Sequence, residues 1–172
     1  MVFARNIVRE TVGRSSAPGE AITKGNRRIC QESSQGLYIT LIDACLDPEM
    51  GKVTYANAGH NPGLHYQAET RTIETLMPTG MPLGIDDEAV YGSRDLYFNP
   101  GDVLLLYTDG VTEAIDSAGE EFGLERLKSV LQVNGQKPVV EIIAEILREA
   151  ENFTGAAPLF DDTTLVIFKR LS

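Results

Sequence analysis

The sequence predicts an α+β fold in which hairpin-connected strands form mostly antiparallel sheets and helices at both ends of the chain cover them. Three observations lead to this prediction. Apolar residues recur at helical spacing in residues 1–32 and again in residues 122–150. Between these segments, short β-rich runs alternate with turns rich in Gly, Pro and Asn. Runs joined by short polar loops pair as antiparallel hairpins, whose sheets can be covered by helices.

Length and composition are typical of one globular domain. The 172 residues are enough to bury a core without disulfides or structural metals. Hydrophobic residues make up 42% of the chain and charged residues 23%, which argues against a disordered protein. There is no internal repeat, low-complexity segment or linker. We therefore expect residues 1–172 to form a single domain.

The net charge of −10 restricts the classes of partner. It argues against nonspecific binding to nucleic acid and to anionic membranes, which both require positive charge. No apolar run is long enough to span a membrane and no signal peptide is present, so we expect a cytoplasmic protein without a membrane segment. Cys30 and Cys45 lack metal-ligand spacing and are expected to be buried or half-buried thiols in a reducing compartment.

The N-terminal part predicts two helices. Apolar residues of Met1–Val12 have helical spacing, but nothing caps the start of this helix, which suggests a chain cut inside or just before it. The second helix begins near Ser16, a suitable N-cap, and runs to about Glu32. Its inner face is expected to contain Ala21, Ile22, Ile29 and Cys30.

The middle of the chain predicts six strands and the end a seventh. The first six are expected at Leu37–Leu46, Lys52–Asn57, Leu64–Gln67, Arg71–Leu76, Val90–Phe98 and Val103–Tyr107. Two amphipathic helices follow, one around Phe122–Leu131 and one around Val139–Ala150, with Pro138 at a first-turn position. Leu165–Phe168 is the last predicted strand.

Three acidic residues stand at strand ends. Asp109 follows the apolar run Val103–Tyr107, and Asp161 and Asp162 precede the last strand. Antiparallel pairing would bring the end of one strand beside the start of the other. Carboxylates gathered there repel one another unless a cation or protons neutralise them, which favours a Mg²⁺ or Mn²⁺ site. The alternative is that both segments are ordinary turns, since Asp and Gly are common turn residues.

Four segments carry a resemblance to a known family. They are Gly101-Asp-Val-Leu-Leu-Leu-Tyr-Thr-Asp-Gly-Val-Thr-Glu-Ala114, Tyr55-Ala-Asn-Ala-Gly-His-Asn-Pro62, Pro82-Leu-Gly-Ile85 and Asp161-Asp-Thr-Thr-Leu-Val166. In order and spacing the chain resembles the metal-dependent protein serine/threonine phosphatases of type 2C, in their bacterial stage II sporulation protein E branch. The resemblance covers essentially the whole chain.

The resemblance implies an α-β-β-α sandwich of two mostly antiparallel sheets flanked by helices. It also implies two Mn²⁺ or Mg²⁺ ions and a metal-activated water that attacks phosphoserine or phosphothreonine, so that no side chain acts as a nucleophile. Asp109 with Gly110, and Asp161, match the family's metal-binding positions. Asp162 matches a neighbouring position, expected to support the site indirectly.

One departure concerns the family's first metal motif, Gly-Asp-Val-Ser-Gly-Lys/His-Gly. It is absent from these 172 residues, as are the first strands of one sheet, so the domain is expected to be N-terminally truncated. Either a fragment of a larger phosphatase or a shortened, inactive relative fits. In both cases we expect this polypeptide alone to hold metal poorly and to turn over slowly or not at all.

Several other polar residues could serve either function or structure. His60 could contact phosphate or a proton, or lie on the surface of a turn, and His65 is expected on the surface. Thr164 could orient the Asp161 carboxylate or simply begin a strand. Glu113 is expected to cap the turn after Asp109 rather than to bind metal. Asn57 and Asn61 are expected to hold their loop through side-chain bonds to the backbone. The Arg27-Arg28 pair could meet a phosphorylated partner, but a solvated helix face is the expectation.

These observations lead to two hypotheses. The first is metal-dependent hydrolysis of phosphoserine or phosphothreonine on a regulatory protein, impaired in this chain. The resemblance implies a partner of the anti-sigma-factor antagonist type and an upstream sensor domain in the full-length protein. A homodimer is one assembly that it allows. The second hypothesis is a non-catalytic module that binds a partner through the same fold. A structural metal-binding domain would explain the acidic residues but not the four ordered motifs.

Overall fold

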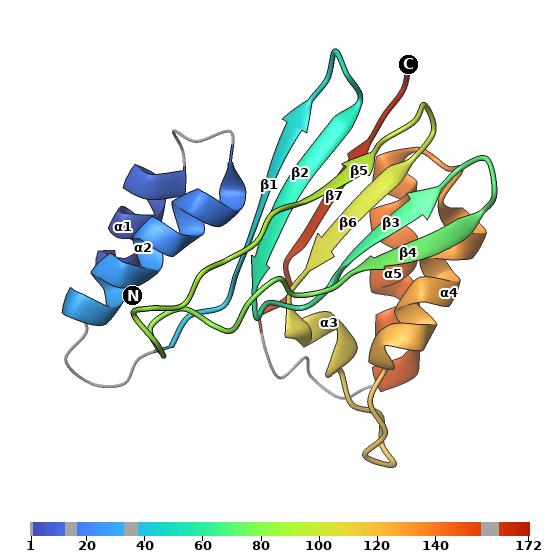
Figure 1. Ribbon diagram of the computed structural model, residues 1–172. Helices are drawn as coiled ribbons and strands as arrows, with labels where there is room; N and C mark the ends of the chain where they lie inside the picture. The colour runs from blue at the N-terminus through green and yellow to red at the C-terminus, as the bar shows by residue number, and fades with distance from the viewer. Residues whose placement is uncertain (1, 13–16, 33–37, 156–161) are drawn as a thin grey trace. The chain divides into compact units, whose positions relative to one another are not determined.

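The computed structural model of this chain describes residues 2–12, 17–32, 38–155 and 162–172. The chain divides into two compact units, and each is described by itself. Unit 1 comprises Met1–His60 and Met77–Tyr97, and unit 2 comprises Asn61–Leu76 and Phe98–Ser172. Helices and two antiparallel sheets are visible in Figure 1, which confirms the predicted α+β class. One domain over residues 1–172 stays a prediction.

Unit 1 contains two helices and a three-stranded sheet. The helices are α1 (Val2–Val12) and α2 (Pro18–Glu32), and the strands are β1 (Leu41–Asp47), β2 (Lys52–Ala58) and β5 (Arg94–Tyr97). The sheet order is β1-β2-β5, and both pairings are antiparallel. The β1–β2 hairpin closes at the Asp47–Lys52 pair, where the sequence predicts a turn.

Helix α2 packs on this sheet through its apolar stripe. Ile22 and Ile29 are buried against Ala56 and Ala58 of β2. On the other side, Gly25 lets α1 approach, since an added Cβ would lie 3.0 Å from the Thr11 hydroxyl. The predicted inner face of this helix is therefore confirmed for its buried aliphatic residues.

The surface of the helix pair carries the basic residues. Arg27 is exposed, and Arg28 makes an ion pair of 2.8 Å with Glu10 of α1 and one of 3.8 Å with Glu32. Such exposed pairs add little stability. The expected solvated helix face is confirmed.

The loop between β4 and β5 is bound to α2. The Asn26 amide is fully buried and donates to the Asp86 carbonyl at 2.6 Å, while its oxygen accepts the Gly84 N–H at 2.8 Å. The Thr23 hydroxyl accepts the Tyr91 N–H at 3.0 Å. Leu83 is buried and exchanges main-chain hydrogen bonds with Ile39. The Pro-Leu-Gly-Ile motif therefore serves packing in unit 1.

Unit 2 contains a four-stranded antiparallel sheet and three helices. The strands are β3 (Gly63–Gln67), β4 (Thr72–Leu76), β6 (Val103–Tyr107) and β7 (Leu165–Lys169), in the order β4-β3-β6-β7. The helices are α3 (Asp109–Thr112), α4 (Gly123–Asn134) and α5 (Val139–Thr154). Figure 1 shows α4 and α5 against one face of this sheet.

The core of unit 2 lies between the sheet and its helices. Leu64, Tyr66 and Leu105 on the strands pack with Leu127 of α4 and Ile146 of α5, and all five are fully buried. At the end of β7 the Lys169 ammonium donates to the Gly135 carbonyl at 3.0 Å and to the Lys137 carbonyl at 2.8 Å. These bonds tie β7 to the α4–α5 connection.

Three sequence predictions need correction. The strand expected at Val90–Phe98 is shorter, because Tyr91 bonds α2 and packs on Gly80 instead of joining a ladder. His65 is buried rather than on the surface, since it lies inside β3 with Asp102 as its partner. Cys45 is exposed near the turn of the β1–β2 hairpin, although Cys30 is half-buried as expected.

Two expected features fall on undescribed residues. The Ser16 N-cap lies outside the described residues, and so does Leu37, the expected start of the first long strand. The ladder of that strand begins at Leu41.

Candidate active site

The pairing of β6 with β7 brings two separated parts of the sequence together. The last pair of the ladder is Tyr107 with Leu165. One residue further, the Thr108 N–H donates to the Thr164 carbonyl at 3.1 Å. The Thr108 hydroxyl donates to the Asp162 carbonyl at 3.0 Å and accepts the Thr164 N–H at 2.9 Å. The end of β6 therefore lies beside the start of β7, as the antiparallel argument predicts.

Asp109 begins α3 directly after this contact. Its side chain is exposed, and its Oδ1 accepts the Gly110 N–H at 3.1 Å. Its carbonyl accepts the Glu113 N–H at 2.8 Å and the Thr112 hydroxyl at 3.3 Å. Glu113 is the C-cap residue of this short helix, which agrees with the expected capping role. The carboxylate keeps acceptor sites that face solvent.

Gly110 plays a different part from that expected of a turn glycine. It lies inside α3, is buried, and is not among the glycines with positive φ. It lines a small cavity of about 20 Å³ with Val111, Leu147 and Thr163 among its neighbours. The assignment of Gly110 to a metal stays a prediction.

The acidic segment before β7 is described in part. Asp161 lies outside the described residues. Asp162 is exposed, and its carbonyl is held by Thr108. Thr164 is exposed and donates its N–H to Thr108, and its expected contact with Asp161 is not tested. We call Thr108, Asp109, Asp162 and Thr164 the acidic corner.

The acidic corner fits a hard cation in its donor chemistry. Carboxylate and carbonyl oxygens are the ligands of Mg²⁺ and Mn²⁺, and Mg²⁺ commonly keeps several waters beside one or two protein carboxylates. Asp109 and Asp162 are both exposed and thus accessible to an ion. Within the described ranges, no three His, Cys, Asp or Glu side chains lie close enough together to hold a metal. These residues therefore provide part of a ligand set.

His60 belongs to a tight turn of unit 1. The buried Asn57 side chain donates to the His60 carbonyl at 3.1 Å and accepts its N–H at 2.8 Å. This confirms the expected role of Asn57 in holding the loop. The ring of His60 is half-buried, with Nδ1 at 3.1 Å from the Thr40 hydroxyl. A role of His60 toward phosphate stays a prediction.

Sequence reasoning missed two features of unit 2. Thr108 stands in the Gly101–Ala114 segment without a distinct signal, because its cross-strand bonds depend on the register of β6 and β7. The buried pair of His65 and Asp102 was also missed, although Asp102 next to a buried strand was a visible signal. A carboxylate directly before an apolar strand needs buried donors, which here are His65 and two main-chain N–H groups.

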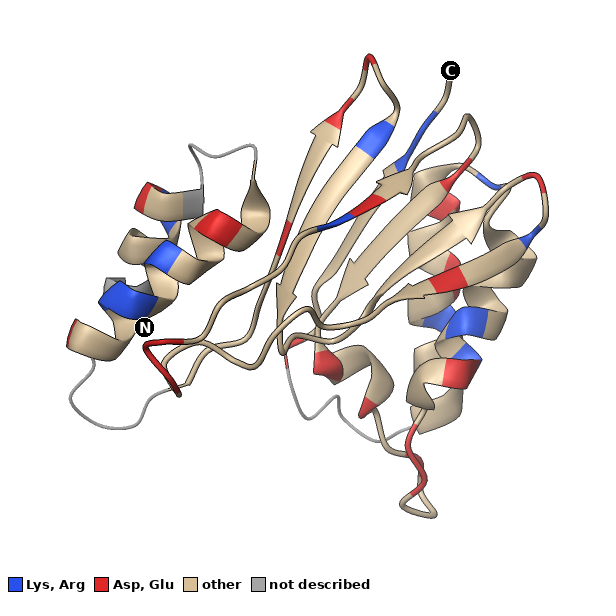
Figure 2. Ribbon diagram, viewed as in Figure 1, with Lys and Arg blue, Asp and Glu red and all other residues tan. Residues whose placement is uncertain are grey.

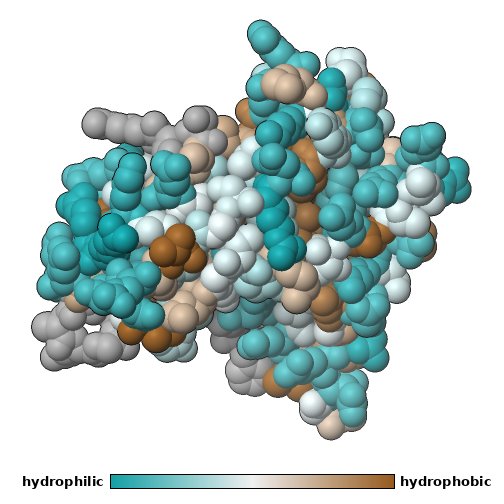
Figure 3. Space-filling model, viewed as in Figure 1, coloured by the Kyte–Doolittle hydropathy of each residue, from teal (hydrophilic) through white to brown (hydrophobic). Residues whose placement is uncertain are grey.

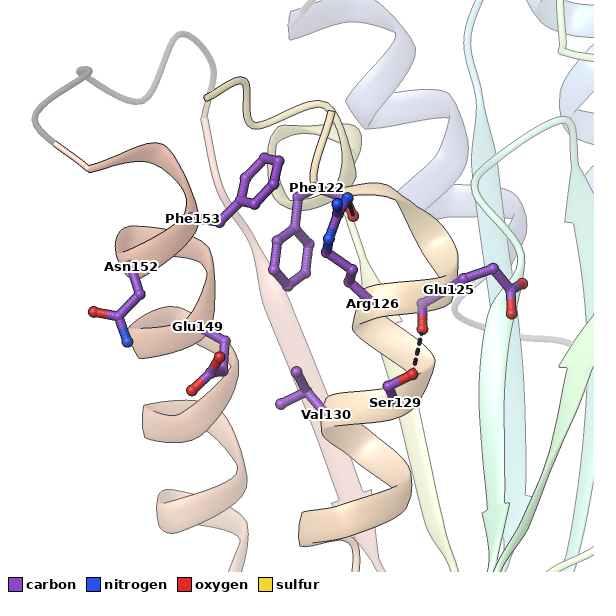
Figure 4. A pocket seen from close by; sticks show the side chains of 8 residues that line it. All are labelled: Phe122, Glu125, Arg126, Ser129, Val130, Glu149, Asn152 and Phe153. Carbon is purple, nitrogen blue, oxygen red and sulfur yellow. Dashed lines mark hydrogen bonds between the residues drawn. The ribbon is translucent and has the colours of Figure 1, made fainter. Parts of the chain in front are cut away.

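A separate groove of about 520 Å³ lies between α4 and α5 (Figure 4). The Arg126 guanidinium lies 4.5 Å from the centre of the Phe153 ring, and Phe122 meets Phe153 edge to face at 5.7 Å. Arg126 also donates to the Phe122 carbonyl at 3.0 Å. This arrangement holds the two helices together. The lining of the groove includes the carboxylates of Glu125 and Glu149 beside the Arg126 guanidinium.

The surface agrees with a chain rich in acidic residues. Figure 2 shows Asp and Glu on α3, on α5 and on several loops. On the face drawn in Figure 3, hydrophobic residues form separate small areas within a mostly hydrophilic surface. Among the described helices, none combines the length and the apolar character that crossing a membrane requires.

Comparison with known proteins agrees with the predicted resemblance. The family model for stage II sporulation protein E (SpoIIE) matches residues 1–171. Phosphoserine phosphatase RsbU of Bacillus subtilis is 30% identical over 155 residues, which cover 89% of this chain and 45% of RsbU. This chain thus spans less than half the length of that relative.

Solved structures share the fold. The SiaA-PP2C domain of Pseudomonas aeruginosa has a TM-score of 0.85 at 18% identity, covering 98% of this chain and 68% of the other. The RsbU and RsbW domains of Rv1364c from Mycobacterium tuberculosis give a TM-score of 0.78 at 24% identity, and the match covers 99% of this chain and 46% of the other. Because the family model covers nearly all of the sequence, this chain belongs to the stage II sporulation protein E (SpoIIE) family.

Proposed function

We propose that this chain is the phosphatase part of a protein serine/threonine phosphatase that dephosphorylates a regulatory protein. The observation that carries the proposal is the meeting of Asp109 and the Asp162 segment at one corner of unit 2. Family membership supports it, and so does the relative RsbU, which is named a phosphoserine phosphatase.

The residues of the corner would act by binding and orienting. Bound Mn²⁺ or Mg²⁺, two ions in the family site, would polarise the phosphoryl group and activate water. Asp109 would be a ligand, fixed by the Gly110 N–H and by its position at the start of α3. Asp161 would be the second carboxylate ligand. Asp162 and Thr164 would keep Asp161 in place through the backbone bonds that they share with Thr108.

We further propose that these 172 residues alone bind metal weakly and turn over slowly. The Gly-Asp-Val-Ser-Gly motif, which would add a bridging carboxylate, is absent from this sequence. If this motif is missing from the whole protein, the alternative function is a non-catalytic module that binds a partner through the same fold.

The partner that we propose is a phosphorylated regulatory protein of the anti-sigma-factor antagonist type, in the cytoplasm. Control by an upstream sensor domain and assembly as a homodimer belong to the same proposal. The regulatory setting is supported by the RsbU likeness and by a related structure in which RsbU and RsbW domains occur in one protein.

Hydrolysis of p-nitrophenyl phosphate with and without millimolar Mn²⁺ tests the proposed activity. We expect slow hydrolysis that requires Mn²⁺ and is lost in Asp109→Asn. Asp116→Asn is the matched control, because the Asp116 carboxylate also belongs to unit 2 and accepts the Ala118 and Glu120 N–H groups of an exposed turn. Hydrolysis that persists in Asp109→Asn would contradict the proposal, and no hydrolysis at any Mn²⁺ concentration would favour the non-catalytic module.

A further inference from the structure

The Thr108 side chain links the two halves of the acidic corner. Its hydroxyl donates to the Asp162 carbonyl at 3.0 Å and accepts the Thr164 N–H at 2.9 Å. The Thr108 N–H adds a third bond, to the Thr164 carbonyl at 3.1 Å. A hydroxyl is one of the few side-chain groups that can donate and accept at once, as this position requires.

These bonds lie just beyond the end of the regular β6–β7 ladder. The regular β6–β7 ladder ends at Tyr107 and Leu165, so Asp109 and Asp162 both lie beyond it. Past the last pair, two strands diverge unless something holds them. Here the Thr108 hydroxyl supplies two bonds and the Thr108 N–H a third, directly before Asp109. Because Thr is β-branched, its χ1 is restricted, and the hydroxyl stays directed across the strands.

We propose that Thr108 is a positioning residue that sets the Asp162 segment against Asp109 for divalent-cation binding. The proposal rests on the proposed function, since it assigns the ion to the same corner. Thr108 itself is not a ligand in this account. It acts through main-chain groups of Asp162 and Thr164, and so fixes where the described start of the β7 segment lies.

Replacement by valine tests this role, since valine has nearly the shape of threonine without the hydroxyl. Thr108→Val leaves the Asp162 carbonyl and the Thr164 N–H without their side-chain partner. Loss of a group that orients metal ligands typically weakens metal affinity by about 10–100-fold. We expect this shift for Thr108→Val, whereas Thr108→Ser keeps the hydroxyl and should bind Mn²⁺ nearly as the wild type does.

The measurement is a Mn²⁺ titration followed by paramagnetic broadening of amide NMR signals from residues 109–112. This readout detects weak binding and needs no turnover. Thr54→Val is the control, because the Thr54 hydroxyl also bridges strands, donating to Asp95 at 2.7 Å in the other sheet. We expect Thr54→Val to leave the Mn²⁺ midpoint unchanged, even where its stability falls as much as that of Thr108→Val.

A measurement without metal separates the positioning role of Thr108 from metal binding at the acidic corner. In the wild type and in Thr108→Ser, hydrogen exchange at the Thr164 amide should be slow, and in Thr108→Val it should be fast. Equal Mn²⁺ midpoints in the wild type and Thr108→Val would overturn the positioning role while leaving the metal corner intact. Absence of Mn²⁺ broadening at residues 109–112 in the wild type would overturn both the positioning role and the proposed function.

Discussion

The His65 ring and the Asp102 carboxylate form a buried pair in unit 2, with 3.1 Å between Nε2 and Oδ2. Both side chains are at most 3% exposed. Asp102 also accepts the Ala68 N–H at Oδ1 and the Asn99 N–H at Oδ2, each at 2.8 Å. One carboxylate thus joins β3, the β3–β4 hairpin and the turn before β6. It fixes the strand that leads to Asp109.

Asp102→Ala should therefore destabilise the protein strongly. The change leaves the buried His65 imidazole and two partly buried N–H groups without their acceptor, and an unsatisfied buried polar group typically costs about 1–3 kcal/mol. Urea unfolding measures the effect. Asp116→Ala is the matched control, because Asp116 accepts two N–H groups in an exposed turn, where water can replace it. A loss of about 1 kcal/mol is expected there. Equal losses in the two variants would contradict the role of Asp102.

Gly59→Ala should be far more damaging than Gly119→Ala. Both glycines have positive φ, 68° and 84°, so alanine at either position carries a backbone cost of about 1–2 kcal/mol. At Gly59 a Cβ would also lie 2.6 Å from the Pro82 ring, whereas at Gly119 no atom lies within 4 Å. We expect Gly59→Ala to exceed Gly119→Ala by about 1–3 kcal/mol in urea unfolding, the range typical of overpacking. Similar values would show that the turn at Gly59 can move away from Pro82.

The stability of the protein should fall at alkaline pH because of Tyr107. Burial raises the pKa of this phenol from 10.0 to about 12. Between these two values the unfolded chain has lost the proton that the folded chain keeps, so stability falls as pH rises through this window. Below pH 10 the Tyr107 phenol is protonated in both states, and its contribution to stability is fully present.

The comparison of wild type with Tyr107→Phe isolates this contribution. Urea midpoints are measured at pH 9 and pH 11.5, and Tyr107→Phe should lose less stability than the wild type between them. Tyr97→Phe is the control, since Tyr97 is 73% exposed. This variant should lose as much stability between the two pH values as the wild type does. Parallel loss in the wild type and Tyr107→Phe would refute the effect of burial.

Strong local patterns made much of the fold predictable. The unbroken apolar run of β6 was placed at Val103–Tyr107, where the structure has it, because Pro100 and Gly101 mark its beginning and Asp109 its end. The meeting of Asp109 with the segment before β7 was also predictable, since it follows from antiparallel pairing alone.

The failures share a physical cause, which is that they depend on contacts distant in sequence. His65 was placed on the surface because its burial depends on Asp102, 37 residues away. The strand at Val90–Phe98 was overextended because Tyr91 bonds Thr23 on α2, 68 residues away. The bonds of the Thr108 hydroxyl are likewise not predictable from local sequence, because Asp162 lies 54 residues away.

Calorimetric titration of the 172-residue chain with Mn²⁺, beside Asp109→Asn, tests the central claim most directly. We predict weak binding to the wild type that disappears in Asp109→Asn, since this carboxylate is a proposed ligand and the Gly-Asp-Val-Ser-Gly motif is absent from these 172 residues. Tight binding to the wild type would contradict the predicted incompleteness of the site. Binding that is the same in both proteins would contradict the assignment of the metal to Asp109.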